Sequence, residues 1–181
     1  MVRFRAVSLF SGAGGLDWGF KEAGFDIVFA NDVLEHMTKT YSLNFGLKNI
    51  TCSRPPCVAE RGVVLQASVE HVDFSGLAGE DVDVLVGGPP CQDFSIVRGP
   101  SRSGIEVRRG RLYAHFVRAL ITLQPKAFVF ENVPGLVSTD NGLAYNVILE
   151  DLRNLKTRWS EVRAVINTGN NSHNIQGYEI I

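Results

Sequence analysis

The sequence predicts an α/β fold, a doubly wound and mainly parallel sheet of the Rossmann-like kind. Three observations support this prediction. The apolar runs are short and continuous, as expected of parallel strands that are buried on both faces. Segments with helical spacing separate these runs. The first run ends in a turn rich in glycine, which is where folds of this class bind ligands.

The expected elements follow one another in a regular order along the 181 residues. Two stretches interrupt the alternation. Residues 46–62, which contain Cys52 and Cys57, are expected to be a surface insertion, and the polar residues 157–176 a loop. The expected strands are residues 6–10, 26–30, 82–86 and 127–130, and the expected helices are residues 16–23, 34–44, 112–123 and 142–155.

Charge is uneven along the chain. The formal net charge is −1, so total charge does not point to a nucleic-acid partner. Residues 98–111 nevertheless hold five arginines and a single acid, Glu106. A local basic segment of this kind is suited to contacts with phosphate, and it is equally compatible with a solvated surface.

The cysteines and the N-terminus bear on the cellular compartment. An odd number of cysteines, three, argues against a disulfide framework and for a reducing compartment. Cys52 and Cys57 have no second pair with ligand spacing, so no metal site is expected. No long apolar segment follows Met1, which predicts neither a signal peptide nor a membrane span and favours a cytoplasmic, nucleoid-associated protein.

The glycine turn indicates a ligand other than a dinucleotide. Gly12, Gly14 and Gly15 do not form G-x-G-x-x-G, because Asp17 stands where the third glycine would fall. Asp32 follows the second expected strand, where an acid commonly accepts hydrogen bonds from ribose hydroxyls. Together these features favour an adenosine-containing ligand. A tight turn beside a helix-capping aspartate is the alternative.

Cys91 directly follows the expected strand 82–86 and its glycines. Pro89 and Pro90 hold the backbone extended just before the thiol. Ligands bind α/β sheets beyond the carboxyl ends of their strands, so a nucleophile is plausible at this position. The alternative is a structural cysteine, since most lone cysteines are small buried hydrophobic residues.

Glu131 ends the expected strand 127–130 in the same way. An acid at the tip of an apolar strand is costly unless it is paired or functional. In the usual doubly wound order, strand 6–10 lies beside strand 82–86, and strand 127–130 comes next. The glycine turn, Cys91 and Glu131 would then lie along one edge of the sheet.

Three motifs, taken in order, resemble those of the DNA (cytosine-5)-methyltransferases. They are Phe-Ser-Gly-Ala-Gly-Gly-Leu at residues 10–16, Gly-Pro-Pro-Cys-Gln-Asp-Phe-Ser at 88–95 and Glu-Asn-Val at 131–133. The resemblance covers the chain from Val7 to about Leu155. It implies transfer of a methyl group from S-adenosylmethionine to C5 of a cytosine that is flipped out of double-stranded DNA.

The resemblance also implies roles for individual residues. Cys91 would attack C6 of the cytosine as a thiolate, and Glu131 would protonate or hydrogen-bond N3. The acid role calls for a raised pKa, which a semi-buried site can provide. Contacts with S-adenosylmethionine are implied for Phe10, Ser11, Gly12, Ala13, Gly14, Gly15, Leu16, Asp32, Val33, Ser68, Pro90 and Leu112. Contacts with the substrate are implied for Gln92, Ser95, Arg98 and Asn132, in part through a mobile loop at residues 92–111. For Asn132 the favoured alternative is that it holds the Glu131 turn in shape.

The sequence departs from the family pattern around the cofactor. Ser8 stands where an aspartate is usual, and Val33 where an aromatic residue often packs on adenine. Ser68 occupies the approximate place of an aspartate that holds the adenine amino group, with Glu70 and Asp73 as alternatives.

The last residues, 177–181, resemble the opening of the strand that leads to the family's Gln-x-Arg-x-Arg motif. We therefore expect residues 1–181 to be an incomplete catalytic domain, without the target recognition domain and the segment that completes the cofactor pocket. The chain would be a fragment or one subunit of a split enzyme. A catalytically silent module that binds the cofactor and needs a second chain is the alternative function. The tRNA-methylating branch of the superfamily is a third, for which no specific feature appears.

Overall fold

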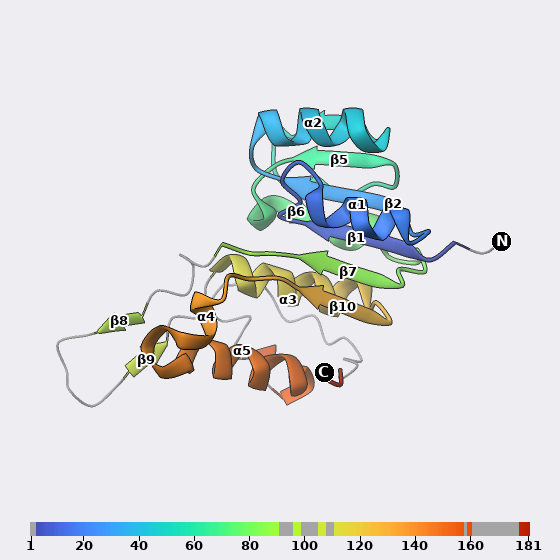
Figure 1. The fold of residues 1–181 in the computed structure, drawn as a ribbon. Coiled ribbons are helices and arrows are strands. Elements are labelled where there is room, and N and C mark those ends of the chain that lie inside the picture. The colour runs from blue at the N-terminus through green and yellow to red at the C-terminus, as the bar shows by residue number, and fades with distance from the viewer. Residues whose placement is uncertain (1–2, 91–95, 99–104, 108–110, 158, 161–177) are drawn as a thin grey trace. The chain divides into compact units, whose positions relative to one another are not determined.

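The computed structural model describes residues 3–90, 96–98, 105–107, 111–157, 159–160 and 178–181 (Figure 1). These residues form two compact units. The first comprises Met1–Gly88 and Thr122–Glu131, and the second Pro89–Ile121 and Asn132–Ile181.

The first unit is built on a six-stranded sheet in the order β10-β7-β1-β2-β5-β3. Every neighbouring pair is parallel, which confirms the predicted fold class. The neighbours predicted for strand 82–86 are also confirmed, since β7 pairs with β1 on one side and β10 on the other. The strands are β1 (Arg5–Leu9), β2 (Asp26–Asp32), β3 (Lys48–Thr51), β5 (Val63–Gln66), β7 (Val84–Gly87) and β10 (Ala127–Phe130).

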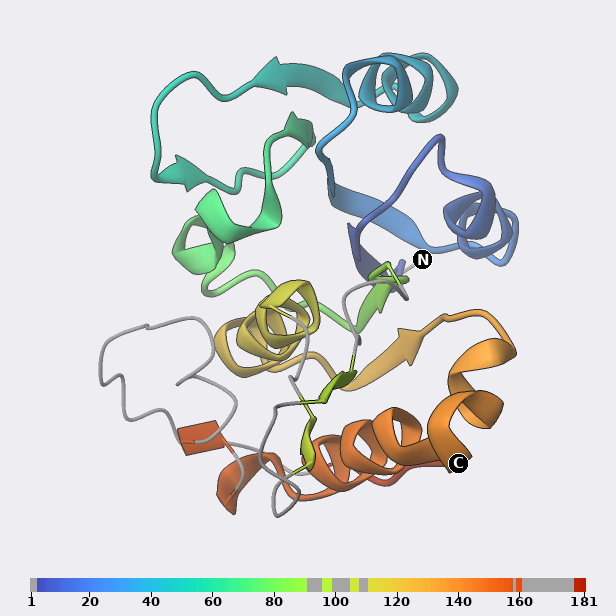
Figure 2. The same ribbon diagram turned by 90° about the vertical axis from the view of Figure 1, so that its left-hand side faces the viewer.

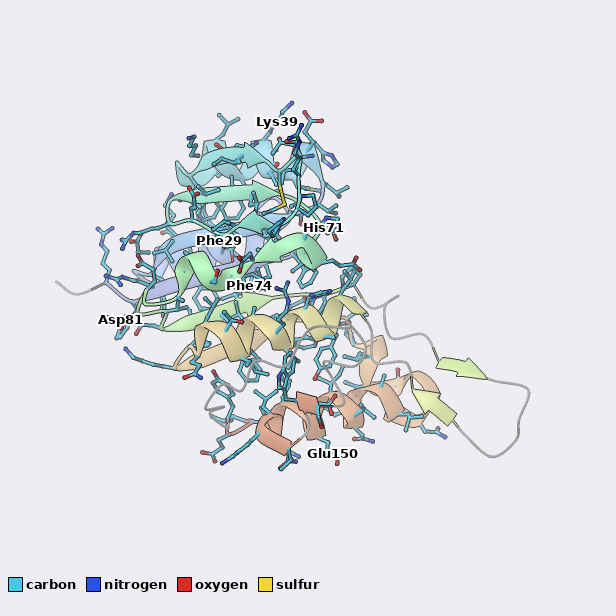
Figure 3. All side chains as sticks on the ribbon, turned by 180° about the vertical axis from the view of Figure 1, so that it is seen from behind. Phe29, Lys39, His71, Phe74, Asp81 and Glu150 are labelled. Carbon is cyan, nitrogen blue, oxygen red and sulfur yellow. A yellow bond between two sulfur atoms is a disulfide. The ribbon has the colours of Figure 1, made fainter. Side chains whose placement is uncertain are left out.

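Two helices, α1 (Gly15–Glu22) and α2 (Glu35–Phe45), lie on one face of this sheet (Figure 2). The other face carries short elements: a two-stranded sheet of β4 (Cys57–Val58) and β6 (Val72–Asp73), and the 3₁₀ turns η1 (Val69–His71) and η2 (Phe74–Leu77). β2 is buried along its middle residues, as its continuous apolar run predicts. The side chains of Phe29 in β2 and Phe74 in η2 are fully buried and belong to the hydrophobic core (Figure 3).

The described residues of the second unit include a hairpin and the helices α3, α4 and α5. The hairpin pairs β8 (Ile96–Arg98) with β9 (Ile105–Val107) in antiparallel register. The helices are α3 (Arg111–Leu123), which continues into the first unit over its last two residues, α4 (Gly135–Ser138) and α5 (Leu143–Arg153); η4 (Thr139–Gly142) joins the last two.

Each predicted strand and helix is present, with both ends within two residues of the prediction. The predicted insertion at residues 46–62 is wrong. Lys48–Thr51 form the edge strand of the main sheet, and Cys57–Val58 pair with β6. The strand β5 was not predicted. Of the predicted loop at 157–176, residues 157, 159 and 160 are helical and the others lie outside the described residues.

The odd number of cysteines argued against a disulfide framework, but the described residues contain a disulfide. Cys52 and Cys57 are bonded, with their α-carbons 5.8 Å apart (the yellow bond in Figure 3). Within the part of the chain that the structure describes, no group of three or more side chains could hold a metal ion. No described helix has the length and apolar character needed to cross a membrane.

Candidate active site

The carboxyl edge of the sheet in the first unit brings together several residues that the sequence analysis singled out. Phe10 follows β1, Asp32 ends β2, Ser68 comes shortly after β5, Gly88 follows β7 and Glu131 follows β10. All these strands are parallel, so their carboxyl ends meet at one edge. The strand order reverses direction at β1, and α/β sheets bind ligands at such a switch point.

The glycine turn between β1 and α1 has left-handed backbone conformations. The φ angles are 55° at Phe10, 54° at Gly12 and 93° at Gly14. A β-carbon at Gly14 would overlap the Phe45 ring, so only glycine fits there. By contrast, a β-carbon at Gly12 or Gly15 would meet nothing within 4 Å. The turn is therefore packed against α2 at Gly14 and open at Gly12 and Gly15.

Asp32 fixes this turn to the end of β2. One carboxylate oxygen accepts a hydrogen bond from the Gly12 amide at 2.9 Å, and the other accepts from the Leu34 amide at 2.9 Å. Asp32 thus holds the turn and the start of α2 together. Each carboxylate oxygen still has a lone pair for a further donor, such as a hydroxyl group. Asp32 is not the N-cap of α2, because that position is Leu34 and has no side-chain cap, and the Asp32 carboxylate can still accept from a ligand.

Asn31 is a residue that the sequence analysis missed. It is buried, and its side-chain amide donates to the carbonyl oxygens of Leu65 at 3.0 Å and Ala67 at 2.9 Å. Asn31 therefore ties the end of β2 to the backbone next to Ser68. The sequence feature that could have identified Asn31 is its position at the end of an apolar strand, because a buried side-chain amide must find hydrogen-bond partners.

Asp17 is a second missed residue, although the glycine spacing drew attention to it. Its side chain is 1% exposed and accepts a hydrogen bond of 2.8 Å from the hydroxyl of Tyr41, which is fully buried. Ser8 of β1 also hydrogen-bonds this carboxyl group. Burial raises the pKa of Asp17, and the hydrogen bonds of Ser8 and Tyr41 only partly offset this rise. The three side chains join β1, α1 and α2 beneath the glycine turn.

Glu131 continues the pairing of β10 with β7, because its amide donates to the Gly87 carbonyl at 3.0 Å. Its side chain is exposed rather than semi-buried as expected. A β-carbon at Gly88 would lie 2.8 Å from the Glu131 carboxylate. The carboxylate therefore lies over the Gly88 backbone, and glycine leaves the room for it.

Asn132 uses its side chain within the second unit. Its Nδ2 donates to the Pro89 carbonyl at 2.8 Å, and its Oδ1 accepts from the Val133 amide at 3.0 Å. The amide group thereby links the turn after β10 to a residue two positions before Cys91. This arrangement favours a positioning role over the predicted contact with the substrate.

The other predicted residues divide into three groups. Val33 is 59% exposed beside Asp32, and Ala13 and Leu16 are exposed in and after the glycine turn. Pro90 is exposed and Leu112 half-buried, both in the second unit. The third group lies outside the described residues and comprises Cys91, Gln92 and Ser95; of Arg98 only the backbone is described.

The sequence model of the family "C-5 cytosine-specific DNA methylase" matches residues 4–160. The chain belongs to this family. A DNA (cytosine-5-)-methyltransferase of Aeropyrum pernix, M.ApeKI, is 57% identical over 185 residues, which cover 100% of this chain and 39% of that protein. The Type II methyltransferase M.NgoFVII of Neisseria gonorrhoeae is 35% identical over 150 residues, covering 83% of this chain and 36% of that protein. This member of the family thus spans less than half the length of both relatives.

Solved structures show the same fold. A protein encoded in an E. coli prophage and described as a DNA modification methyltransferase superposes with a TM-score of 0.58 at 30% identity, covering 81% of this chain and 37% of that one. The DNMT2 of Spodoptera frugiperda superposes with a TM-score of 0.55 at 23% identity, covering 82% and 40%. The second likeness bears on the fold alone.

S-adenosylmethionine is the methyl donor of this family. The residues of the first unit fit this cofactor. The hydroxyl oxygen of Ser11 is buried in the glycine turn and has no hydrogen-bond partner among the described residues. Ser11 directly precedes the open position Gly12, and the Gly12 amide is bonded to the Asp32 carboxylate. A ligand with hydroxyl and carboxylate groups would satisfy these atoms.

The buried Asp17 leads to a prediction on pH. Its folded-state pKa is raised, so the stability it contributes is full below its unfolded pKa, about 4, and is lost as pH rises through the folded value. Asp17→Asn retains an acceptor for Tyr41 without the charge. As pH rises from about 4 to about 8, the wild type should lose stability and Asp17→Asn should not. The free energy of unfolding of Asp17→Asn, relative to that of the wild type, should therefore increase by on the order of 1 kcal/mol.

Urea unfolding across this pH range measures the effect. Asp17→Ala is the control, because it leaves the Tyr41 hydroxyl without its acceptor and should cost about 1–3 kcal/mol at every pH. Parallel stability curves for the wild type and Asp17→Asn would contradict the assignment of a raised pKa to Asp17.

Proposed function

We propose that the protein carrying this chain transfers a methyl group from S-adenosylmethionine to C5 of cytosine in double-stranded DNA. One observation carries the proposal. β7 lies between β1, which leads to the glycine turn, and β10, which leads to Glu131. Gly88, the first residue of the Gly-Pro-Pro-Cys sequence, directly follows β7 at the carboxyl end of the sheet. A thiol, an acid and a cofactor turn thus follow three adjacent strands. Membership of the family and the name of the Aeropyrum relative support the same function.

The first unit supplies the groups that would hold the cofactor. α1 begins after Gly14, which has no side chain to cap it, so amides of its first turn are available to the methionyl carboxylate. The Ser11 hydroxyl would assist there, and Asp32 would accept from the ribose hydroxyls. Val33 and Ser68 would flank the adenine. When bound, S-adenosylmethionine supplies a methyl group on a positively charged sulfur, ready for transfer to a nucleophilic carbon.

Cys91 would act as the nucleophile. It comes three residues after Gly88, a distance that extended chain spans in at most about 11 Å. Its thiolate would form a bond to C6 of a cytosine flipped out of the duplex. The electron pair of the C5–C6 double bond then makes C5 nucleophilic. After methyl transfer, loss of the C5 proton and cleavage of the sulfur–C6 bond restore the aromatic ring.

Glu131 would supply the proton or hydrogen bond at N3, so that negative charge does not build up on the ring when the thiolate adds. Its carboxylate lies over Gly88 and has no hydrogen-bond partner among the described residues. It is therefore available to a substrate. The arginines between residues 98 and 111 would contact DNA phosphates, with Gln92, Ser95 and Arg98 closest to the flipped base.

A second candidate function is a cofactor-binding part that is silent without a second chain. The share of the Aeropyrum relative that the chain spans, 39%, supports it. The chain also covers 55% of the Type II methyltransferase M.AquIA of Picosynechococcus sp., at 32% identity. Under either candidate the substrate is DNA, so we place the protein at the nucleoid. Because the Neisseria and Picosynechococcus relatives are called Type II methyltransferases, we propose a role in restriction and modification.

The test is transfer of a tritiated methyl group to fragments of duplex DNA of mixed sequence. We expect Cys91→Ala to abolish transfer and Glu131→Gln to slow it by about 10²-fold or more. Lys39→Gln, on the exposed outer face of α2, is the matched control and should keep full activity. Turnover by Cys91→Ala would refute the mechanism. Methyl transfer to tRNA instead of DNA would refute the proposed substrate. Activity that appears only when a second chain is added would establish the second candidate function, a cofactor-binding part that is silent alone.

The link from Asn132 to Pro89 gives a separate prediction. Asn132→Ala removes the donor to the Pro89 carbonyl, so the backbone before Cys91 is held less firmly. We expect kcat to fall by about tenfold while the KM for S-adenosylmethionine stays within about twofold, since the cofactor groups belong to other residues. Steady-state kinetics at varied cofactor concentration measures both constants. A raised KM for the cofactor with unchanged kcat would contradict the positioning role.

A further inference from the structure

The disulfide joins the two segments that hold the ends of the loop carrying Ser68. Cys52 lies just after β3, and its amide donates to the Gln66 carbonyl at 3.1 Å, where β5 ends. Cys57 lies in β4 and pairs in register with Val72 of β6. Residues 67–71 run between these two points. The sulfur–sulfur bond therefore closes the base of this loop covalently.

Other contacts define the two ends further. At the first end, the Thr51 hydroxyl donates to the Gln66 side chain at 2.8 Å, and Asn31 holds the Ala67 carbonyl. At the second end, the Ala59 amide donates to the Asp73 carbonyl at 2.8 Å. The first end belongs to the main sheet and the second to the small sheet β4–β6. The disulfide is thus a covalent connection between the two sheets.

The end of the loop at Val72 depends on the disulfide more than the end at Gln66 does. β4 and β6 are two residues long each, and so short a ladder is weak by itself. Gly76 of η2 packs so closely on Ala59 that a β-carbon there would overlap the Ala59 carbonyl. Cys57 is almost fully buried in this packing. A bond from Cys57 to Cys52 anchors the small sheet to the strand edge beside Gln66.

We propose that the Cys52–Cys57 disulfide is a positioning cross-link of the cofactor site, which fixes the loop 67–71 and thereby tightens binding of S-adenosylmethionine. The inference rests on the proposed function, in which Ser68 flanks the adenine. Neither cysteine touches the cofactor. Both act through the backbone at Gln66 and Val72.

The cross-link is reversible by thiol chemistry. Reduction breaks the bond between the two sulfurs, and each sulfur gains one electron and one proton. Two molecules of a thiol such as glutathione supply them and are oxidised to one disulfide. The reduced protein then has free thiols at Cys52 and Cys57, and its loop 67–71 loses the covalent closure while it keeps its hydrogen bonds and the buried side chain of Val69. The loop then moves over a wider range, and the cofactor must restrict this range when it binds, which lowers the affinity.

The first experiment compares the dissociation constant of S-adenosylmethionine for the oxidised and reduced protein by titration calorimetry. All samples carry Cys91→Ser, because this readout is binding and the substitution prevents thiol exchange with Cys91. We expect about tenfold weaker binding after reduction, and the same loss in the double variant Cys52→Ser, Cys57→Ser. Circular dichroism at the titration temperature checks that each form is folded. Equal affinities would overturn the inference.

The second experiment uses the reciprocity of linked equilibria and needs no further variant. The fraction of disulfide is measured in glutathione redox buffers by thiol counting, with and without saturating S-adenosylmethionine. Linkage requires the reduction equilibrium constant to fall, when the cofactor is present, by the same factor as the affinity loss. A role in stability alone would leave this constant unchanged by the cofactor, and that result would overturn the inference.

Asp32→Ala separates this inference from the proposed function. Suppose that S-adenosylmethionine binds to the wild type, that Asp32→Ala abolishes this binding, and that the disulfide has no influence on the affinity. In that case only the inference about the disulfide fails, and the proposed function stands. If neither oxidised nor reduced wild type binds the cofactor, the proposed function fails with it. Adenosine used as the titrant should show the same dependence on the disulfide, because the loop 67–71 belongs to the adenine side of the site; an equal affinity of adenosine in both states would place the effect elsewhere and contradict the inference.

Discussion

The hydrogen bond of 2.9 Å between the Gly12 amide and the Asp32 carboxylate holds the glycine turn against the end of β2. The arrangement of the proposed cofactor site depends on this bond. The same carboxylate reaches the Leu34 amide, so the turn and the start of α2 share one anchor. Asn31, the preceding residue, extends the anchor to the end of β5 and to the loop of Ser68. One strand end thus sets the positions of three neighbouring segments.

A buried polar group supports the turn from below. Asp17 and Tyr41 bond to each other in the core between α1 and α2, and Ser8 reaches the same carboxyl group from β1. This contact gives a physical reason for the departure from the family pattern at Ser8. An aspartate there would place a second carboxylate beside Asp17 in a buried site, at a high electrostatic cost. A hydroxyl group can donate to Asp17 instead.

The sequence predicted those features that local pattern determines and missed those that tertiary contacts determine. The bounds of β10 were predicted to the residue, because its apolar run is continuous, but its predicted burial is wrong: β10 is an edge strand whose residues are exposed or half-buried. The strand β3, Lys-Asn-Ile-Thr, was predicted to be part of a surface insertion because it lies at the sheet edge and is half exposed, so no apolar run marks it. Asp17 and Asn31 bond to residues 24 to 36 positions away, which no local pattern shows. The odd number of cysteines was a misleading signal, because it does not prevent two of them from bonding to each other, as Cys52 and Cys57 do.

The central claim is that the carboxyl edge around β1 and β2 binds S-adenosylmethionine, and amide hydrogen exchange tests it most directly. Exchange is followed by mass spectrometry with and without a saturating concentration of the cofactor. The account predicts slower exchange in residues 10–16, 31–34 and 66–69, with the amino edge of the same strands unchanged. Protection confined to other segments, at a concentration where calorimetry shows full binding, would contradict it.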